Sequence, residues 1–444
     1  MTLEATNTGS SLYRTDARTK RRNAAEKRFR FYGMATVAFG VLALLLLLGS
    51  ILGSGLSAFR QTTMDLTVTL DEKVLDKKGA RDPADLAKVT TVGYAKLLET
   101  ALIQEVTEKG LAPAGMKPKD IAGLISKEAP AQLRNKVLAH PDLIGQTITF
   151  NVLANGRVDG FFKGRVTMES AALDSNISPE QLTLAQAMRD AGLMSMGFNL
   201  GFITAPDASE LRPEAAGLGV AVLGSAYMML IVLVLSLPIG VAASIYLEEF
   251  APKNWITDLI EVNISNLAAV PSIVFGILGL AAFINFAGMP QSSPVVGGLV
   301  LTLMTLPRII IPARAALKSV PPSIKDAALG VGASKMQTVF HHVLPLATPG
   351  ILTGAIIGLA QALGETAPLL LIGMVAFVRD YPAAPPEGFF DPASAIPVQI
   401  YSWTQRADPA FTERASGAII VLMIFLLVMN SLAVVLRRKF ERRW

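Results

Sequence analysis

Long stretches without charge alternate with short charged segments along this chain of 444 residues. Asp, Glu, Lys and Arg are all absent from six stretches: 31–59, 215–247, 262–307, 336–364, 366–378 and 415–436. A helix needs about 20 mostly apolar residues to cross a bilayer, so the longest stretch can hold two spans, and Glu365 interrupts another span. The pattern predicts six membrane-spanning helices, near residues 32–57, 218–246, 260–284, 295–315, 348–378 and 416–436.

The charges between these spans predict their orientation. Residues 1–30 carry eight basic and three acidic side chains, and residues 437–444 carry five and one. Segment 58–216 has 18 basic and 20 acidic residues, and segment 379–414 has three and five. Basic loops stay on the cytoplasmic side of a membrane, and six spans place both ends of a chain on the same side. We therefore expect both termini to be cytoplasmic and segment 58–216 to be external.

The composition supports a membrane protein and excludes several kinds of chemistry. Apolar residues make up 51% of the chain and charged residues 17%, against roughly 25% charged in soluble domains. The absence of Cys excludes disulfides, thiolate metal sites and cysteine nucleophiles, and three His leave little room for a histidine metal site or triad. A net charge of +5 is too small for this length to indicate nucleic-acid binding. No resident cofactor or metal is expected.

Segment 58–216 is long enough to form a domain of its own. Apolar residues recur with helical spacing over 93–109, and alternation predicts a strand over 147–153. The Asn-Gly pair that follows indicates a hairpin and a second strand over 157–166. We expect a soluble α+β domain. Its patterns favour a docking or structural module, and leave open a ligand-binding or sensing domain.

The loop after the fourth span carries the most informative pattern. Two prolines precede Ser323, which with Asp326 has the spacing of a capping box at the start of a short helix. Small residues at 330–332 permit a sharp turn. A second capping signature at Ser334 predicts another helix, which would end before Pro345. These two helices would form a rigid projection on the cytoplasmic face, although an ordinary re-entry connection could have the same form.

Six residues of this loop match a known motif: Asp326, Ala327, Ala328, Gly332, Leu344 and Pro345. They resemble the EAA loop of ABC importer permeases, which reads Glu-Ala-Ala, three residues, Gly, nine residues, Ile-x-Leu-Pro. This chain has Asp326 in place of Glu, which keeps the carboxylate, and His342 in place of Ile, which weakens one apolar contact. The resemblance implies that loop 321–346 holds the coupling helix that fits a groove on an ATP-hydrolysing subunit.

The fifth span carries an acid among apolar residues, Glu365 in the string Gly-Glu-Thr-Ala-Pro-Leu-Leu. A charge inside a membrane helix is costly, so this carboxylate should face the bundle interior or a water-filled path. Two roles stay open. One is a structural pair with Arg308, or with Asn263 or Asn266, that holds helices together. The other is a part in the permeation path or its gating, together with Thr366 and the same polar residues.

The same string resembles the PstA type of phosphate permease of ABC importers, as do residues 397–401 and 306–323. The resemblance covers about residues 215–437, and segment 58–216 looks like the insertion found after the first span in a longer, proteobacterial subset. Many shorter relatives have Arg where this chain has Gln361, so no intramembrane arginine is carried over to that position.

The resemblance implies an all-α polytopic membrane protein with about six spans, an ABC importer type I permease core and an inserted α+β external domain. Its parts would be a basic cytoplasmic tail, a first span, a periplasmic domain, a five-helix transmembrane domain and a second basic tail: 1–31, 32–57, 58–216, 217–437 and 438–444. The chain has no G-x-x-x-x-G-K-[ST] phosphate loop. It would therefore be a transport subunit rather than an enzyme, with ATP and Mg bound by a partner ATPase.

The resemblance further implies a phosphate importer of the bacterial inner membrane. Its partners would be a second homologous permease, two ATP-binding subunits, a periplasmic phosphate-binding protein and the surrounding lipid. Two alternatives remain at this point. One is an ABC permease for another oxyanion, sulfate or molybdate, or for an organic solute. The other is an ion-gradient-driven secondary carrier, which would need intramembrane ion sites and usually has inverted repeats.

Overall fold

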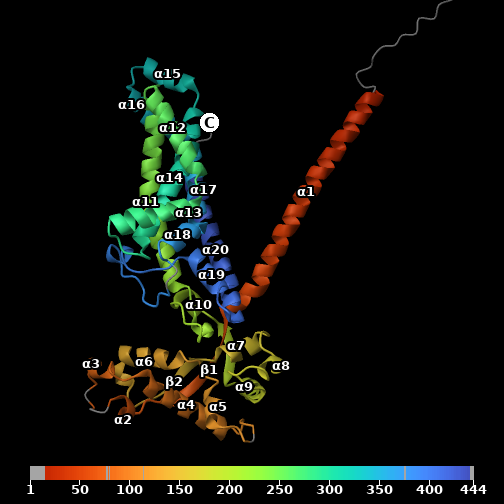
Figure 1. Cartoon of the computed structure of the whole chain (residues 1–444), viewed down its shortest axis with the longest axis vertical. Helices are drawn as coiled ribbons and strands as arrows, with labels where there is room; N and C mark the ends of the chain where they lie inside the picture. Colours follow the sequence, from red (N-terminus) through yellow and green to blue (C-terminus); the bar gives the residue numbers. More distant parts are fainter. Residues whose placement is uncertain (1–15, 77–78, 80, 114, 375–376, 441–444) are drawn as a thin grey trace, which may run out of the picture. The chain divides into compact units, whose positions relative to one another are not determined.

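Figure 1 presents the computed structural model of the chain, which describes residues 16–76, 79, 81–113, 115–374 and 377–440. The chain divides into two units, residues 1–53 and 54–444. Parts of the two predicted basic tails, residues 1–15 and 441–444, lie outside the described residues.

The first unit is described by one long helix, α1 (Ala17–Gly55), of 39 residues. The helix begins earlier than the predicted span 32–57, because the Ala, Lys, Arg and Glu residues before that span are good helix formers. At 1.5 Å per residue, α1 is longer than the hydrocarbon core of a bilayer requires. Its apolar side chains, including Leu44 to Leu47, are exposed.

The second unit begins with a small α+β domain, residues 58–216. Its three antiparallel strands have the order β2-β1-β3, with bounds Arg60–Thr69 (β1), Thr147–Leu153 (β2) and Met194–Phe198 (β3). The α-helices described between β1 and β3 are α2 (Glu72–Leu75), α3 (Pro83–Leu86), α4 (Thr91–Glu108), α5 (Pro118–Ala122), α6 (Ala129–Ala139), α7 (Gly156–Phe162), α8 (Met168–Ala171) and α9 (Pro179–Asp190).

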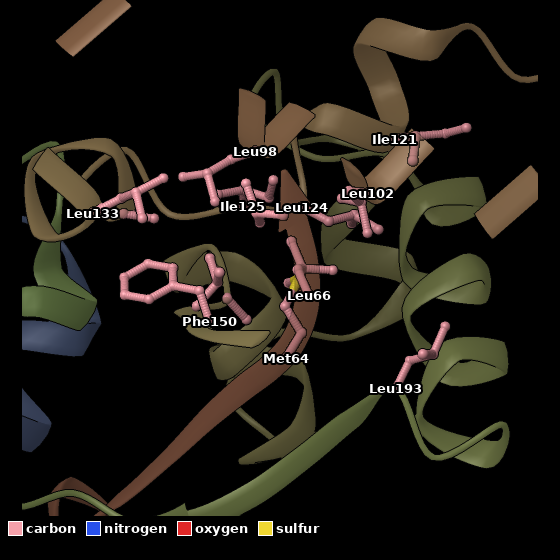
Figure 2. Packing of buried hydrophobic residues seen from close by; sticks show 14 of the residues in the cluster. Met64, Leu66, Leu98, Leu102, Ile121, Leu124, Ile125, Leu133, Phe150 and Leu193 are labelled. Atoms are coloured by element: carbon pink, nitrogen blue, oxygen red, sulfur yellow. The ribbon is translucent and has the colours of Figure 1, made fainter. Parts of the chain in front are cut away.

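One hydrophobic core holds the α+β domain together, as Figure 2 shows. Met64 and Leu66 point from one face of β1 into this core and are fully buried. Leu98 and Leu102 of α4 lie in the same cluster, and their spacing of four residues is the one that places side chains on one helix face. The alternation of β1 and the helical period of α4 therefore bury one common surface.

The helix α4 and the strand β2 confirm two sequence predictions, but the predicted hairpin is wrong. Asn155 is the N-cap of α7, and its side chain accepts a hydrogen bond from the backbone N–H of Arg157. The φ of Asn155 is −53°, whereas a type I′ hairpin turn requires a positive φ there. Residues 157–166 consequently begin as a helix rather than a second strand.

The membrane helices follow the α+β domain. The longest are α11 (Gly219–Ile245), α14 (Pro294–Lys318), α17 (Leu344–Gly364) and α20 (Pro409–Phe440). π-helical turns extend α11 over Tyr246–Phe250 (η4) and precede α17 over Thr338–Val343 (η6). Among the described residues, α1 included, five helices are long and apolar enough to cross a membrane, and a bent helix pair gives a sixth if it counts as one span.

That bent pair occupies the position of the predicted third span. Helix α12 (Trp255–Ala269) and helix α13 (Ser272–Gly279), which continues as a π-helix over Leu280–Phe286 (η5), meet at an angle of 101°. Val270 between them is extended, because the proline at 271 disfavours helical geometry in the residue before it. A single straight helix over 260–284 is therefore wrong.

The predicted fifth span is also interrupted. Helix α17 ends at Gly364, Glu365 is extended with φ −75° and ψ 128°, and a short helix α18 (Ala367–Leu371) follows. Pro368, in the first turn of α18, has no N–H with which to continue the α17 ladder. The span over 348–378 is therefore interrupted rather than continuous, and Glu365 lies at a helix end.

Short elements complete the chain between the long helices: η1 (Leu56–Phe59), η2 (Pro141–Leu143), α10 (Gly201–Thr204), η3 (Pro213–Ala215), α15 (Pro322–Gly330), α16 (Lys335–Gln337), η7 (Glu387–Phe389) and α19 (Ile396–Thr404). These elements together confirm the predicted fold class: a mostly helical membrane protein with several apolar spans, and with a small α+β domain between the first span and the second.

Candidate functional site

The loop between α14 and α17 forms two helical segments joined by a sharp turn, as the sequence predicts. Helix α15 begins after its N-cap Pro321, two residues earlier than expected, so the predicted cap at Ser323 is wrong. Ser334 does cap α16 in a capping box with Gln337. The helix then continues through the π-helical turn η6 into α17 instead of ending before Pro345, which is the second residue of α17.

Gly332 makes the turn in this loop possible. Its φ is +91°, a left-handed conformation that side chains with a Cβ rarely adopt. Its N–H donates to the carbonyl of Leu329 at 3.0 Å, and the N–H of Ala333 donates to that of Ala328 at 3.1 Å. These bonds satisfy the last carbonyls of α15 and end the helix.

The motif residues of the loop are split between the surface and the interior. Asp326 and Ala327 are exposed, and Ala328 is buried. A hollow of about 390 Å³ lies between the two segments, with Val331 and His342 on its lining. Val331 lies at the tip of the loop and is 87% exposed.

Ion pairs fasten the loop to the helix bundle. Lys325 Nζ lies 2.5 Å from Glu249 Oε1, which belongs to the π-helical end of α11. The neighbouring Glu248 lies 3.5 Å from Arg314 of α14, and Arg314 also binds Glu261 of α12 at 2.6 Å. The acidic end of α11 thus bridges the loop and two further helices. Our sequence predictions missed this brace, although two adjacent acids after a long uncharged stretch were a visible signal.

Reversing the charge of Lys325 should weaken this brace. In Lys325→Glu, two acids would face each other beside Glu249, whose side chain is only 8% exposed. The resemblance to ABC importer permeases implies ATP-driven transport, and we expect its rate to fall about tenfold, since an unpaired buried charge costs a few kcal/mol. The measurement is the initial rate of uptake at equal amounts of protein in the membrane.

Two further variants control this experiment. Lys318→Glu makes the same charge change at an exposed lysine before the loop and should leave uptake unchanged. The double variant Lys325→Glu with Glu249→Lys restores opposite charges and should recover most of the rate. A double variant no better than the single one would contradict the ion pair as the cause.

Within the membrane region, Glu365 pairs with Arg308. Arg308 Nη1 of α14 lies 3.6 Å from Glu365 Oε1, with 20% and 17% of the two side chains exposed. This distance allows an ion pair but is too long for a hydrogen bond. The two helices approach closely enough for the pair because a Cβ on Gly354 would lie 2.5 Å from the ring of Pro312 in α14.

The two asparagines predicted for the pathway lie apart from this ion pair, whereas Thr366 lies beside it. The Asn263 side chain donates to the carbonyl of Leu259 in its own helix, and Asn266 is exposed on the same helix. Neither asparagine is hydrogen-bonded to Glu365. Thr366 follows Glu365 directly and is the N-cap of α18, with its carbonyl accepting from the next turn. The structure therefore brings together Arg308, Glu365 and Thr366.

A cleft of about 890 Å³ opens in the α+β domain. Its lining includes Glu214, whose buried carboxyl accepts a hydrogen bond from Ser126 at 2.5 Å. Burial raises the pKa of this carboxyl, and the Ser126 hydroxyl opposes that shift. The charged groups on the lining balance in sign: Lys119, Lys127, Arg157 and Arg212 against Glu99, Glu210, Glu214 and Asp408. The cleft therefore shows no preference for one charge of ligand.

Comparisons with known proteins separate the chain into two regions. Residues 236–444 match the family described as "Binding-protein-dependent transport system inner membrane component". Residues 16–172 match a domain of unknown function, DUF3333. The coupling-type loop and the Arg308–Glu365 pair both lie in the first of these matches.

Individual relatives agree with the first match. The probable ABC transporter permease protein YqgI of Bacillus subtilis is 34% identical over 227 residues, which cover 49% of this chain and 76% of the relative. The phosphate transport system permease protein PstA of Yersinia pestis is 29% identical over 229 residues, covering 51% and 75%. The solved structure of the MetNI methionine ABC transporter matches 51% of this chain and 95% of the solved chain at 16% identity, with a TM-score of 0.38. We draw nothing about function from this match.

Proposed function

We propose that this chain is the permease subunit of an ATP-driven importer of inorganic phosphate. The proposal proceeds from its family: the chain belongs to the binding-protein-dependent transport system inner membrane components, which are the permeases of ABC transporters. The observation that carries the substrate is the similarity to phosphate permeases named PstA in several bacteria, at 28–29% identity over about half the chain. The family match, residues 236–444, includes the loop and the intramembrane ion pair. The similarity to PstA does not favour sulfate or molybdate.

In this proposal the loop around Gly332 binds the ATPase subunit. Asp326, Ala327, Ala328, Gly332, Leu344 and Pro345 would form or support the contact, and the ATPase would hold ATP and Mg. Two features of the loop support this role. Val331 is exposed at the tip of the loop, and the Lys325–Glu249 pair can pass a displacement of the loop into α11.

The other partners follow from the family. Its permeases depend on a binding protein, so we infer a periplasmic phosphate-binding protein, a second homologous permease and two ATP-binding subunits. The exposed apolar residues of α12 and α13, such as Leu259, Val262 and Ile277, offer a surface for the second permease or for lipid. The charge distribution supports the bacterial inner membrane with both termini in the cytoplasm.

The pathway would pass the polar residues of the membrane region. Asn263 and Asn266 are exposed on α12, where their amides could face a second permease across the passage. The gate would consist of Arg308, Glu365 and Thr366. It would be closed while the two charges are paired, and open when they separate and Arg308 can attract an anion. This arrangement suits a passage that binds phosphate weakly.

Uptake in a reconstituted system tests the function. The complete complex is placed in vesicles with the binding protein outside and ATP inside, and the uptake of radiolabelled phosphate is followed. We expect ATP-dependent uptake that an excess of sulfate or molybdate does not reduce and that an ionophore does not abolish. Competition by either oxyanion would indicate the rival permease, and loss of uptake with the ionophore would indicate a secondary carrier.

A further inference from the structure

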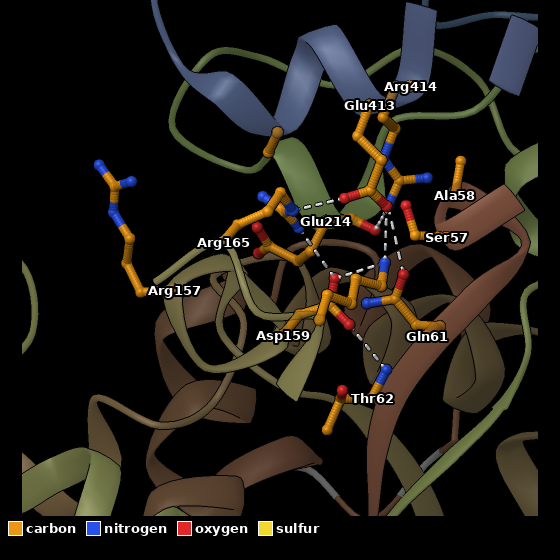
Figure 3. Close-up of polar contacts among 12 residues, drawn as sticks. Ser57, Ala58, Gln61, Thr62, Arg157, Asp159, Arg165, Glu214, Glu413 and Arg414 are labelled. Carbon is orange, nitrogen blue, oxygen red and sulfur yellow. Dashed lines mark hydrogen bonds and ion pairs between the residues drawn. The ribbon is translucent and has the colours of Figure 1, made fainter. Parts of the chain in front are cut away.

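Charged side chains, most of them buried, join the α+β domain to the start of α20 (Figure 3). Lys163 Nζ lies 2.7 Å from Asp159 Oδ2 and 3.0 Å from Glu413 Oε1, and these three side chains are 2–5% exposed. Arg165 also forms an ion pair with Glu413. One carboxylate of the last span is thus held between two cations of the α+β domain.

Arg414, the next residue of α20, makes a second set of contacts. Its guanidinium donates to the carbonyls of Ala216 at 2.9 Å and Glu214 at 2.8 Å, and to the Gln61 side chain at 3.2 Å. It is 2% exposed, and its charge lies 5.5 Å from the ring centre of Phe202. This one side chain therefore ties the last span to β1, to the end of the α+β domain and to α10.

The network continues into the sheet. Asp159, which binds Lys163, also accepts a hydrogen bond from the backbone N–H of Thr62 in β1 at 2.9 Å. The backbones pack tightly beside it, since a Cβ on Gly417 of α20 would lie 2.7 Å from the Cβ of Ala58. No part of this junction is a loose tether between the domain and the helix.

Burial makes the junction resistant to displacement. Exposed ion pairs contribute little and can exchange partners with water. Here any rotation of the domain about the end of α20 would leave Glu413 or Arg414 buried without a partner, which is far more costly than keeping the network intact.

Helix α20 leads from this network to the intramembrane ion pair. Its residues Leu422 and Phe425 pack against the hydrophobic cluster that contains Ala362 and Leu363 of α17. Leu363 is two residues from Glu365. The same rigid helix therefore contacts the α+β domain at one end and the end of α17 along its length.

We propose that the α+β domain and α20 move as one rigid body, with Glu413 and Arg414 as the positioning residues that hold them together. This inference rests on the proposed transport function. The domain would brace the last span while the Glu365 end of α17 moves against it in each transport cycle. A loosened junction would then slow transport without changing the affinity for phosphate.

Spin labels can test the rigid body, because the chain has no cysteine to remove. Labels at Thr100→Cys in α4 and Thr412→Cys in α20, both exposed positions, report the distance between the domain and the helix. In the full complex in vesicles, we expect one narrow distance distribution, the same with and without ATP. With Glu413→Gln, the distribution should broaden. A distance that changes with ATP in the otherwise unchanged protein would overturn the proposal.

Uptake kinetics supply the second readout. We expect Glu413→Gln to lower the maximal rate of phosphate uptake about tenfold, because a junction that has lost one partner of a buried ion pair no longer braces α20, with an unchanged half-saturating phosphate concentration. Glu169→Gln, at an exposed acid of the same domain, is the matched control and should behave like the parent protein. An unchanged maximal rate in Glu413→Gln, or a changed half-saturating concentration, would contradict the positioning role.

A milder variant covers the case in which Glu413→Gln fails to reach the membrane. Arg165→Gln removes the more exposed of the two cations at Glu413 and keeps Lys163 with both of its buried carboxylates, so we expect a smaller broadening and a smaller loss of rate. If the complex takes up no phosphate at all, the proposed function fails, whereas the label distances still decide whether the domain and α20 form one body.

Discussion

Replacing Gly332 with proline should abolish ATP-driven uptake while the protein remains in the membrane. The residue has a φ of +91°, and proline is restricted to about −65°. The substitution also removes the N–H that donates to Leu329, so the turn between α15 and α16 must rearrange. We expect at least a tenfold fall in uptake, equivalent to about 1.4 kcal/mol, measured at equal membrane abundance.

A neighbouring glycine provides the control for this prediction. Gly330 lies at the end of α15, without a positive φ, and a Cβ there would meet nothing within 4 Å. Gly330→Ala should therefore keep normal uptake. Normal uptake in Gly332→Pro, at normal abundance, would contradict a coupling role for the loop.

The second large effect is expected at the intramembrane ion pair. Arg308→Gln and Glu365→Gln each leave the other charge without its partner. Breaking a fully buried pair lowers the free energy of unfolding by about 3–5 kcal/mol, and we expect a smaller loss here because both side chains are partly exposed. We expect each single variant to melt at a lower temperature and to take up phosphate at least about tenfold more slowly. Thermal unfolding in detergent and initial uptake rates measure the two effects separately.

The double variant separates a structural pair from a gate. With both residues changed to Gln, no unpaired charge remains, and we expect stability to recover while uptake stays low. Recovery of both would indicate a purely structural pair. Glu387→Gln, at an exposed acid outside the spans, is the matched control and should change neither quantity.

Patterns within short stretches of sequence predicted those helices and strands whose form depends on nearby residues alone. Uncharged length located α11, α14 and α20, and helical and alternating periods located α4 and β2. The third span was predicted as a single helix because the count of apolar residues does not register a break. Its break comes from the proline at 271, and the fifth span breaks near Pro368, where a proline inside an apolar segment already indicates a kink.

The candidate site was predictable only in part, for a related reason. The turn at Gly332 follows from spacing within one loop. The pairs Lys325–Glu249 and Lys163–Glu413 join residues 76 and 250 positions apart, and no period in the sequence connects them. Counting charges assigned Asp159 and Lys163 to an external segment, as if solvated, whereas both are buried against α20. Which charges lie inside depends on tertiary structure.

The strand order of the α+β domain bears on how such a domain could have been acquired. The chain enters the sheet on β1 and leaves it on β3, and these strands are neighbours, with Arg60 opposite Phe198. Because its two ends lie side by side, a domain of this kind can be inserted into an existing loop without separating the flanking segments. Removing the domain again is harder. A short turn could close the remaining connection, but Glu413 and Arg414 would lose the partners that the domain supplies.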